Sequence, residues 1–216
     1  MSSNPRDFTL ETSDLCCSRG DRRLISDLSF SLRSGEALHF KGHNGSGKTT
    51  LLRTLAGLLA AESGEIRWNG NNARQIRQEF QSKLLYLGHL NGLKGDLTAV
   101  ENLRFDAVLH GKPLDEDRAW QIFDSIGLRG YEDLPTKYLS QGQKRRVALA
   151  RLWVSKATLW ILDEPFSALD VDAVEALQGV IRQHVEQGCM VIITTHQDVS
   201  FTSQEAKVLT IGASDA

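Results

Sequence analysis

Cysteine is scarce in this sequence and follows no pattern that would give it a structural role. The three thiols are Cys16, Cys17 and Cys189, an odd number, and no two cysteines are spaced as C-x-x-C. Neither a disulfide framework nor a zinc site is therefore indicated. We expect reduced thiols, as in a protein of the cytosol.

Long apolar runs and an excess of one charge sign are also missing. No apolar run approaches the roughly 20 residues that span a bilayer, and the polar start at residues 1–6 has no stretch typical of a signal peptide. The 25 basic and 27 acidic side chains leave a net charge of −2, without a basic signature for nucleic acid or a polybasic membrane tail. We expect a soluble or peripheral protein that does not bind nucleic acid and acts on a membrane only through a partner.

The sequence does contain a glycine-rich stretch between an expected strand at 36–41 and an expected helix at 51–56. It consists of Gly42, His43, Asn44, Gly45, Ser46, Gly47, Lys48, Thr49 and Thr50. The pattern G-x-x-x-x-G-K-T in this context predicts a phosphate-binding loop, with backbone N–H groups turned toward phosphate oxygens at the positive end of a helix. Lys48 is predicted to reach the β- and γ-phosphates of a nucleotide, and the Thr49 hydroxyl to ligate Mg²⁺.

Strands that alternate with helices predict an α/β fold with a mainly parallel sheet, preceded by antiparallel strands. We expect short strands within 8–33, with turns at 20–21 and 34–35. Further strands are predicted at 64–70, 84–87, 159–162, 190–193 and 207–211, and helices at 73–81, 98–109, 115–126, 140–155 and 172–187. These elements indicate a single domain over residues 1–216 with an inserted helical subdomain at about 90–155.

Two helices of that subdomain begin with the pattern of a capping box. Thr98 stands three residues before Glu101, and Ser140 three residues before Gln143. The helix at 115–126 carries apolar residues at helical spacing, namely Trp120, Ile122, Phe123 and Ile126. We expect these side chains to belong to the core, with part of one face left as a docking surface.

A second chemical pattern follows the apolar run Leu159–Leu162, which suits a strand buried on both faces of a parallel sheet. Asp163 ends that run and Glu164 follows it. In nucleotide hydrolases with a phosphate loop, an aspartate in this place helps to hold Mg²⁺. The next carboxylate is placed to polarise an attacking water as general base. A solvated turn is the alternative, but the phosphate loop in the same chain favours the catalytic interpretation.

The third pattern is Leu139–Arg146, with the letters LSQGQKRR, at the start of an expected helix. It resembles the signature motif of ATP-binding-cassette (ABC) ATPases. The resemblance extends over about residues 14–197 and includes Ser167–Asp170 at the D-loop position and His196 at the position of the switch histidine. It implies the P-loop NTPase fold of an ABC transporter nucleotide-binding domain, an ATPase activity, and ATP with Mg²⁺.

In that family two cassettes pair head to tail, and each signature closes on the ATP held by the other phosphate loop. The resemblance therefore implies a homodimer in which Ser140, Gly142 and Gln143 complete the partner's site. A helix N-terminus with a serine suits a γ-phosphate, and the phosphate loop already has a helix of its own. Asp170 is implied to couple the two sites, and His196 to contact the γ-phosphate.

The sequence departs from the family pattern at three positions. The adenine-stacking aromatic is missing, and Arg19 in its place offers a guanidinium plane to the base. His89 stands where the family has the Q-loop glutamine. An imidazole there can bind a divalent ion or donate to water, so His89 is a candidate catalytic residue. Gln141 replaces a glycine of the signature, while Gly142 still permits close approach to a phosphate.

Several stretches resemble one branch of the family, the ATP-binding subunits of bacterial cytochrome c biogenesis haem exporters. They are 85–89, 97–103, 146–153, 159–170 and 194–197. The resemblance implies a peripheral protein on the cytoplasmic face of the inner membrane. Its partners would be integral-membrane permease subunits and, indirectly, a haem-carrying periplasmic chaperone. The sequence has no C-x-x-C-H haem-attachment pattern, so the chain is not predicted to be a cytochrome itself.

Two other interpretations stay open from the residues themselves. One is a soluble ABC ATPase, such as a component of iron–sulfur assembly, because no residue of the sequence identifies the partner. The other is a nucleotide-gated interaction module without hydrolysis, suggested by His89 and the missing aromatic. The presence of Glu164 and His196 argues against this second alternative.

Overall fold

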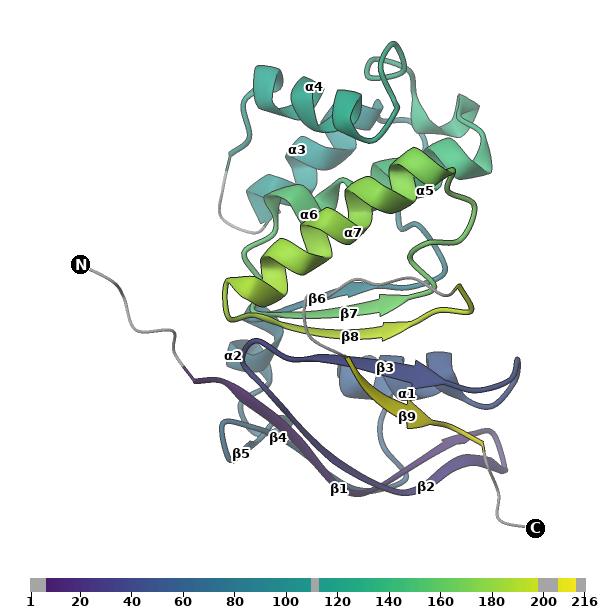
Figure 1. The fold of residues 1–216 in the computed structure, drawn as a ribbon, viewed down its shortest axis with the longest axis vertical. Coiled ribbons are helices and arrows are strands. Elements are labelled where there is room, and N and C mark those ends of the chain that lie inside the picture. Colours follow the sequence, from purple (N-terminus) through teal and green to yellow (C-terminus); the bar gives the residue numbers. More distant parts are fainter. Residues whose placement is uncertain (1–6, 110–112, 198–205, 213–216) are drawn as a thin grey trace. The chain divides into compact units, whose positions relative to one another are not determined.

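The computed structural model describes residues 7–109, 113–197 and 206–212 (Figure 1). The chain divides into two compact units. The sheet unit comprises Met1–Gly88, Ala157–Glu164 and Ile181–Ala216, and the helical unit comprises His89–Lys156 and Pro165–Val180. That one nucleotide-binding domain covers residues 1–216, with a helical subdomain at about 90–155, stays a prediction.

A parallel sheet forms the centre of the sheet unit, with the strand order β6-β7-β8-β3-β9. Its strands are β3 (Ala37–Lys41), β6 (Leu84–Leu87), β7 (Leu159–Asp163), β8 (Met190–Thr194) and β9 (Lys207–Thr210). Every residue of β7 and β8 is buried, which explains their unbroken apolar runs. Because all pairs are parallel, the carboxyl ends of these strands meet at one edge. The predicted α/β fold class is confirmed.

An antiparallel sheet with the order β2-β1-β4-β5 completes the strands of this unit. Its members are β1 (Thr9–Arg19), β2 (Arg22–Arg33), β4 (Ser63–Trp68) and β5 (Asn71–Asn72). The expectation of short strands within 8–33 was wrong, since β1 and β2 have 11 and 12 residues and are joined at Gly20–Asp21. Register shifts in the β1–β2 pairing interrupt the alternation, so one long strand resembles several short ones.

Helix α1 (Lys48–Leu55) packs between the two sheets and anchors the glycine-rich stretch that precedes it (Figure 1). Its Leu51, Leu52 and Leu55 side chains are fully buried in one cluster with residues of β1 and β3. Helix α2 (Arg77–Ser82) begins later than predicted. The Asn72 side chain accepts the N–H of Arg74 at 2.9 Å, and this local turn competes with helix formation.

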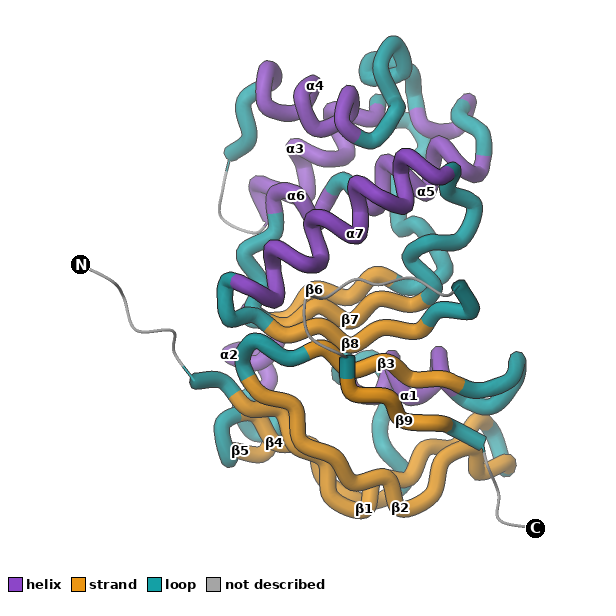
Figure 2. The backbone as a smooth tube through the Cα atoms, in the orientation of Figure 1, coloured by secondary structure: helices purple, strands orange, loops and turns teal. Residues whose placement is uncertain are grey.

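The helical unit consists of helices and loops, and its described residues form no strand (Figure 2). Its elements are α3 (Ala99–Leu109), α4 (Glu116–Ser125), the 3₁₀ turn η1 (Thr136–Tyr138), α5 (Gln141–Leu149) and α6 (Arg151–Val154). Helix α7 (Val171–Glu186) begins in this unit and ends in the sheet unit. Within the described ranges, no helix combines the length and the apolarity that crossing a membrane requires.

Two expectations for these helices need correction. The predicted helix at 140–155 is interrupted at Ala150, where the Trp153 N–H bonds to the Ala150 carbonyl at 3.1 Å, a tighter i to i+3 step. Trp120 is 41% exposed rather than part of the core. It follows the buried Ala119 by one residue, about 100° around the helix. The buried positions expected for Ile122, Phe123 and Ile126 are confirmed.

Candidate nucleotide site

The glycine-rich loop joins β3 to α1 at the carboxyl edge of the parallel sheet. Gly45 and Gly47 adopt left-handed backbone conformations, with φ of 83° and 99°. A Cβ atom on Gly47 would lie 2.8 Å from the Leu24 Cβ, so a larger residue would not fit. The loop is thus curled and held against β2, which is the form that turns backbone N–H groups toward an anion.

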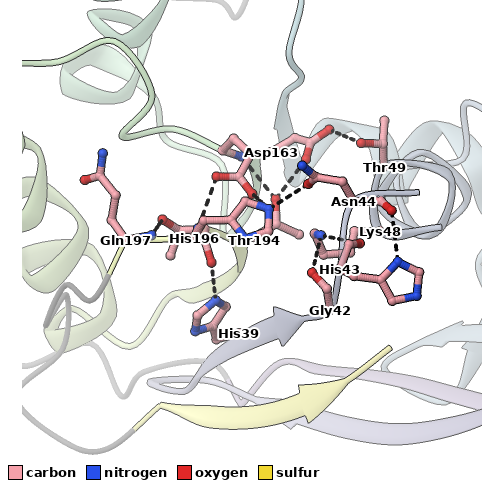
Figure 3. A network of polar contacts seen from close by, with 12 residues as sticks. His39, Gly42, His43, Asn44, Lys48, Thr49, Asp163, Thr194, His196 and Gln197 are labelled. Carbon is pink, nitrogen blue, oxygen red and sulfur yellow. Dashed lines mark hydrogen bonds and ion pairs between the residues drawn. The ribbon is translucent and has the colours of Figure 1, made fainter. Parts of the chain in front are cut away.

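The Lys48 side chain is buried and lies beside Gly42 and His43 of this loop (Figure 3). Its ammonium group donates to the carbonyl oxygens of Gly42 at 2.6 Å and His43 at 3.1 Å. An ammonium group has three N–H donors, so the two loop bonds leave one for an oxygen of a ligand. Lys48 therefore both shapes the loop and places a positive charge beside it.

Asp163 lies at the end of β7 and is 2% exposed. The Thr49 hydroxyl donates to its Oδ2 at 2.8 Å, and the Thr194 hydroxyl donates to its Oδ1 at 2.8 Å. Because the Thr49 proton is directed at the carboxylate, the lone pairs of its oxygen are available to a cation. A hydroxyl and a carboxylate are hard oxygen donors of the kind that Mg²⁺ prefers, so these two residues fit that ion.

A magnesium ion usually keeps several waters and takes few protein ligands. No group of three His, Cys, Asp or Glu side chains converges on a metal position in the described part of the chain. The pair Thr49 and Asp163 suits an ion that shares its other ligands with nucleotide phosphates.

Glu164 follows Asp163 with a left-handed backbone, φ 49°, which is uncommon for a residue other than glycine. Its N–H donates to the carbonyl oxygen of Thr194 at 3.1 Å. The backbone N–H of His196 donates to the Glu164 Oε2 at 3.3 Å, and the His196 ring Nε2 lies 3.5 Å from Oε1. The carboxylate of the candidate general base is thereby held by the segment that follows β8.

His196 connects this carboxylate to the phosphate loop. Its Nε2 lies 3.0 Å from the Asn44 Oδ1, on the loop. The carbonyl of the preceding residue, Thr195, accepts a hydrogen bond from the buried His39 Nε2 at 3.1 Å (Figure 3). A carbonyl only accepts, so the His39 proton is on Nε2. Burial lowers the pKa of His39, which favours its neutral form.

The predicted signature residues lie in the helical unit and cap a helix. Ser140 and Gln143 form a capping box at the start of α5: the Gln143 N–H donates to Ser140 Oγ at 3.2 Å, and the Ser140 N–H to Gln143 Oε1 at 2.8 Å. Thr98 and Glu101 form the same arrangement before α3. Both predicted boxes are confirmed. A Cβ on Gly142 would lie 3.3 Å from a neighbouring carbonyl oxygen, so space there is tight.

Asp170 caps α7 by accepting the Ala173 N–H on Oδ1 at 3.0 Å. The same carboxylate pairs with the guanidinium of Arg146, which also donates to the Ile126 carbonyl at 3.0 Å. The Ala173 N–H and then Arg146 hold the pKa of Asp170 below its ordinary value. Arg146 thus joins the signature helix α5 to the start of α7, a contact that the sequence did not predict.

The structure brings together Lys48, Thr49, Asp163, Glu164 and His196, all within the sheet unit. The roles of these five residues, and of the other predicted site residues, stay predictions. Arg19 and His89 are exposed. A cavity of about 410 Å³ beside the phosphate loop is lined by Arg22, Arg23, His43, Ser46 and Gly212 among others, and Arg19 is not one of its lining residues.

Sequence reasoning missed two residues of this network, Thr194 and His39. Thr194 ends a buried strand, and it pairs in register with Asp163 on the adjacent strand. A polar residue at that end of a strand, next to an acidic one, was the available signal. For His39 no comparable signal existed, because its partner is a backbone carbonyl 156 residues away.

These observations define a class, an α/β nucleotide-binding protein with a phosphate loop after β3 and an acidic pair at the end of β7 in the same parallel sheet. Comparison with known proteins agrees. The model of the ABC transporter family matches residues 25–167. A solved ABC transporter ATP-binding protein of Pyrococcus furiosus superposes with a TM-score of 0.80 at 25% identity, covering 94% of this chain and 97% of that one.

The curated relatives point to one branch of this family. The cytochrome c biogenesis ATP-binding export protein CcmA of Dechloromonas aromatica is 52% identical over 203 residues, covering 94% of this chain and all of the relative. CcmA of Nitrosospira multiformis is 52% identical over 191 residues, covering 88% and 93%. The chain therefore belongs to the ABC transporter family, in the branch of cytochrome c biogenesis ATP-binding export proteins. The predicted family and its ATP-binding ATPase class are confirmed.

Proposed function

We propose that the chain hydrolyses ATP to power an inner-membrane ABC complex in cytochrome c maturation. In this proposal, ATP hydrolysis drives haem export or the release of a haem-loaded periplasmic chaperone. One observation carries the ATPase part: Asp163 and Glu164 are bonded to Thr49 of the phosphate loop on one side and to the His196 segment on the other. The branch to which the chain belongs supports the pathway.

Each residue of the network has a chemical task in this proposal. Lys48 neutralises charge on the β- and γ-phosphates. Thr49 and Asp163 hold Mg²⁺, and with the ion bound the phosphate charge is further offset. Glu164 accepts a proton from the attacking water as general base. His196 keeps the Glu164 carboxylate next to the loop and lies near the expected γ-phosphate.

We propose that the active form is a homodimer of cassettes. Ser140 is exposed at the N-terminus of α5, where backbone N–H groups and the helix dipole favour an anion. In a second copy, Gly142 and Gln143 would contribute to the same phosphate contact. Asp170 pairs with Arg146 of the same helix α5, and in this proposal it couples the closure of one nucleotide site to the other.

The membrane subunits are proposed to cover an apolar patch of the helical unit. Phe105, Val108 and Leu109 of α3 are exposed. Phe105 and Leu109 line a cavity of about 290 Å³, which is also lined by Leu93 and Lys94 of the loop after His89. A cytoplasmic segment of an integral-membrane partner with apolar side chains would bury this patch. The chain would then be peripheral to the cytoplasmic face of the inner membrane.

The experiment that tests the function uses Glu164→Gln in the full chain. We expect ATP hydrolysis to fall by about 10²- to 10⁴-fold, because the general base is lost. ATP binding should persist, so the variant should accumulate as an ATP-bound dimer in size-exclusion chromatography. Glu175→Gln on the exposed side of α7 is the matched control and should hydrolyse ATP normally.

The partner is tested by isolating tagged Glu164→Gln with ATP from detergent-solubilised membranes. Small integral-membrane subunits and a haem absorption spectrum would support the proposal. A soluble assembly partner and no membrane subunit would leave the ATPase chemistry intact but reassign the protein to iron–sulfur assembly or a similar soluble role. Unchanged hydrolysis by Glu164→Gln would refute the catalytic assignment.

A further inference from the structure

Thr194 contacts both acidic residues of the site through a single hydroxyl. It ends β8, is completely buried, and pairs in register with Asp163 of β7. Its Oγ1 donates to the Asp163 Oδ1 at 2.8 Å and accepts the Glu164 N–H at 3.1 Å. The directions are certain, because a carboxylate accepts and a backbone N–H donates.

The first of these bonds fixes the Asp163 carboxylate from one side, while Thr49 fixes it from the other. Oδ1 accepts from Thr194 and Oδ2 from Thr49, each at 2.8 Å. A rotation of the carboxylate about its Cβ–Cγ bond would break both contacts. The Thr194 hydroxyl therefore helps to set the plane in which Asp163 presents an oxygen to a cation.

The second bond supports an unfavourable backbone conformation. Glu164 has φ 49°, and its N–H is shared between the carbonyl oxygen and the hydroxyl of Thr194, both at 3.1 Å. Strained residues at active sites persist where their surroundings hold them. The direction in which the chain leaves β7, and with it the position of the Glu164 carboxylate, depends on these contacts.

We propose that Thr194 is a positioning residue of the ATPase reaction, whose hydroxyl sets both the Asp163 carboxylate and the Glu164 backbone. This inference rests on the proposed roles of Asp163 and Glu164. Loss of the hydroxyl removes one charge-assisted hydrogen bond, so we expect the Mg²⁺-dependent gain in nucleotide affinity to fall roughly tenfold. The turnover number should fall by a similar factor, since the general base shifts as well.

The test compares Thr194→Val, which replaces the hydroxyl by a methyl group, with Thr194→Ser, which retains it. The matched control is Thr12→Val in the antiparallel sheet. Thr12 is also buried, and its hydroxyl likewise donates once, to the Leu28 carbonyl at 3.0 Å, and accepts once, from the Phe30 N–H at 3.1 Å. The control likewise removes one donated and one accepted hydrogen bond of a buried threonine hydroxyl, but neither bond involves an acidic residue.

The dissociation constant of a fluorescent ATP analogue is measured with Mg²⁺ and with EDTA, together with kcat and KM for ATP. In Thr194→Val the affinity with EDTA should match the unmodified chain, while the gain from Mg²⁺ and kcat should fall. Thr194→Ser should restore both, and Thr12→Val should change neither. If thermal unfolding shows that Thr194→Val does not fold, Thr194→Ser and Thr194→Ala provide the comparison, since they differ by the one oxygen.

A folded Thr194→Val chain with an unchanged Mg²⁺ effect and unchanged kcat would overturn the proposal. Equal losses in Thr12→Val would do the same, because the effect would then be general destabilisation. Failure of the proposed function looks different: the unmodified chain and Glu164→Gln would hydrolyse ATP at the same rate. The affinity measurement needs no hydrolysis and decides the question in either case.

Discussion

The phosphate-loop region of the sheet unit and the signature region of the helical unit are both predicted to bind phosphates of ATP, but they are built differently. In the first, Lys48 and Asp163 are buried and bonded to other site residues from several strands and the loop. In the second, Ser140 is exposed and is bonded to Gln143 of its own helix. The first region is organised within one chain, whereas the second has the character of a half-site.

The difference suggests how the two regions would respond to nucleotide. A network whose groups already bond to one another undergoes little reorganisation when the ligand binds, which is the preorganisation that catalysis needs. A capped helix end presents donors to whatever anion approaches it. The sheet unit would therefore supply the catalytic groups. The signature of a second copy would complete the nucleotide site only when the two copies close on each other.

The largest expected effect comes from complementation between two inactive variants. Lys48→Ala removes the positive charge at the phosphate loop, and Gly142→Asp places a negative charge in the signature. Each pure variant should lose ATPase activity by at least about 100-fold, as when one phosphate or oxyanion contact is removed. In a mixed dimer, the intact loop of one chain faces the intact signature of the other, so the mixture should hydrolyse ATP well above the sum of the two.

The control is Lys48→Ala mixed with the double variant Lys48→Ala, Gly142→Asp, which contains no intact loop. That mixture should stay inactive. Differentially tagged chains would show that mixed dimers form. If they form and activity does not return, the half-site interpretation of the signature is wrong and the comparison between the two regions fails.

The sequence predicted the parts of the fold in which local pattern and tertiary environment agree. The apolar runs of β7 and β8 are buried along their whole length. The spacing of the phosphate loop predicted its strand and helix, and both capping boxes were recognised from two residues each. Local chemistry was sufficient at each of these places.

The contacts that the sequence did not reveal depend on register between distant segments. Thr194 meets Asp163 because β7 and β8 are adjacent and parallel with a particular register. His39 bonds to a backbone carbonyl, a group that every residue carries and that the sequence therefore cannot reveal. The register shifts that interrupt the alternation along β1 likewise arise from its pairing with β2. A single sequence does not state strand order or register, so these features needed the structure.

A moderate effect should distinguish the sheet unit from the helical unit by their response to acid. His184, in the sheet unit, is buried and stacks on Trp160 with ring centroids 3.6 Å apart. Burial lowers the pKa of His184 to about 4. Between pH 6.5 and about 4 the unfolded chain binds a proton that the folded chain does not. The free energy of unfolding is therefore highest above pH 6.5, where His184 is neutral in both states. It falls as the pH decreases from 6.5 to about 4, and His184 causes no further loss below that value.

The measurement is urea-induced unfolding at pH 7.5 and pH 5. His184 alone should lower the free energy of unfolding by about 2 kcal/mol between these values. His184→Phe keeps an aromatic ring on Trp160 but cannot titrate, so its pH dependence should be smaller by that amount. An equal pH dependence in both chains would show that His184 is not the acid-sensitive group. If His184 is the acid-sensitive group, limited proteolysis at pH 5 should cut the sheet unit before the helical unit.

The smallest effect, and the finest test of the comparison, comes from the two capping boxes of the helical unit. Ser140→Ala and Thr98→Ala remove the same kind of cap, so each should lower stability by about 1 kcal/mol. Ser140 is also a proposed phosphate ligand. Its loss should therefore reduce ATP hydrolysis roughly tenfold, as for one hydrogen bond to a charged group, while Thr98→Ala keeps normal hydrolysis.

Thermal unfolding measures the stability losses, and an ATPase assay measures the hydrolysis rates. ATP-dependent dimer formation in the Glu164→Gln background tests the phosphate contact of Ser140 without hydrolysis. Equal stability losses with a weaker dimer only for Ser140→Ala would assign the Ser140 hydroxyl two functions, a cap in the free chain and a ligand in the dimer. If the two variants behave alike in both measurements, Ser140 is a helix cap and nothing more. The phosphate contact across the dimer would then have to come from the backbone N–H groups of α5, which an alanine at position 140 leaves in place.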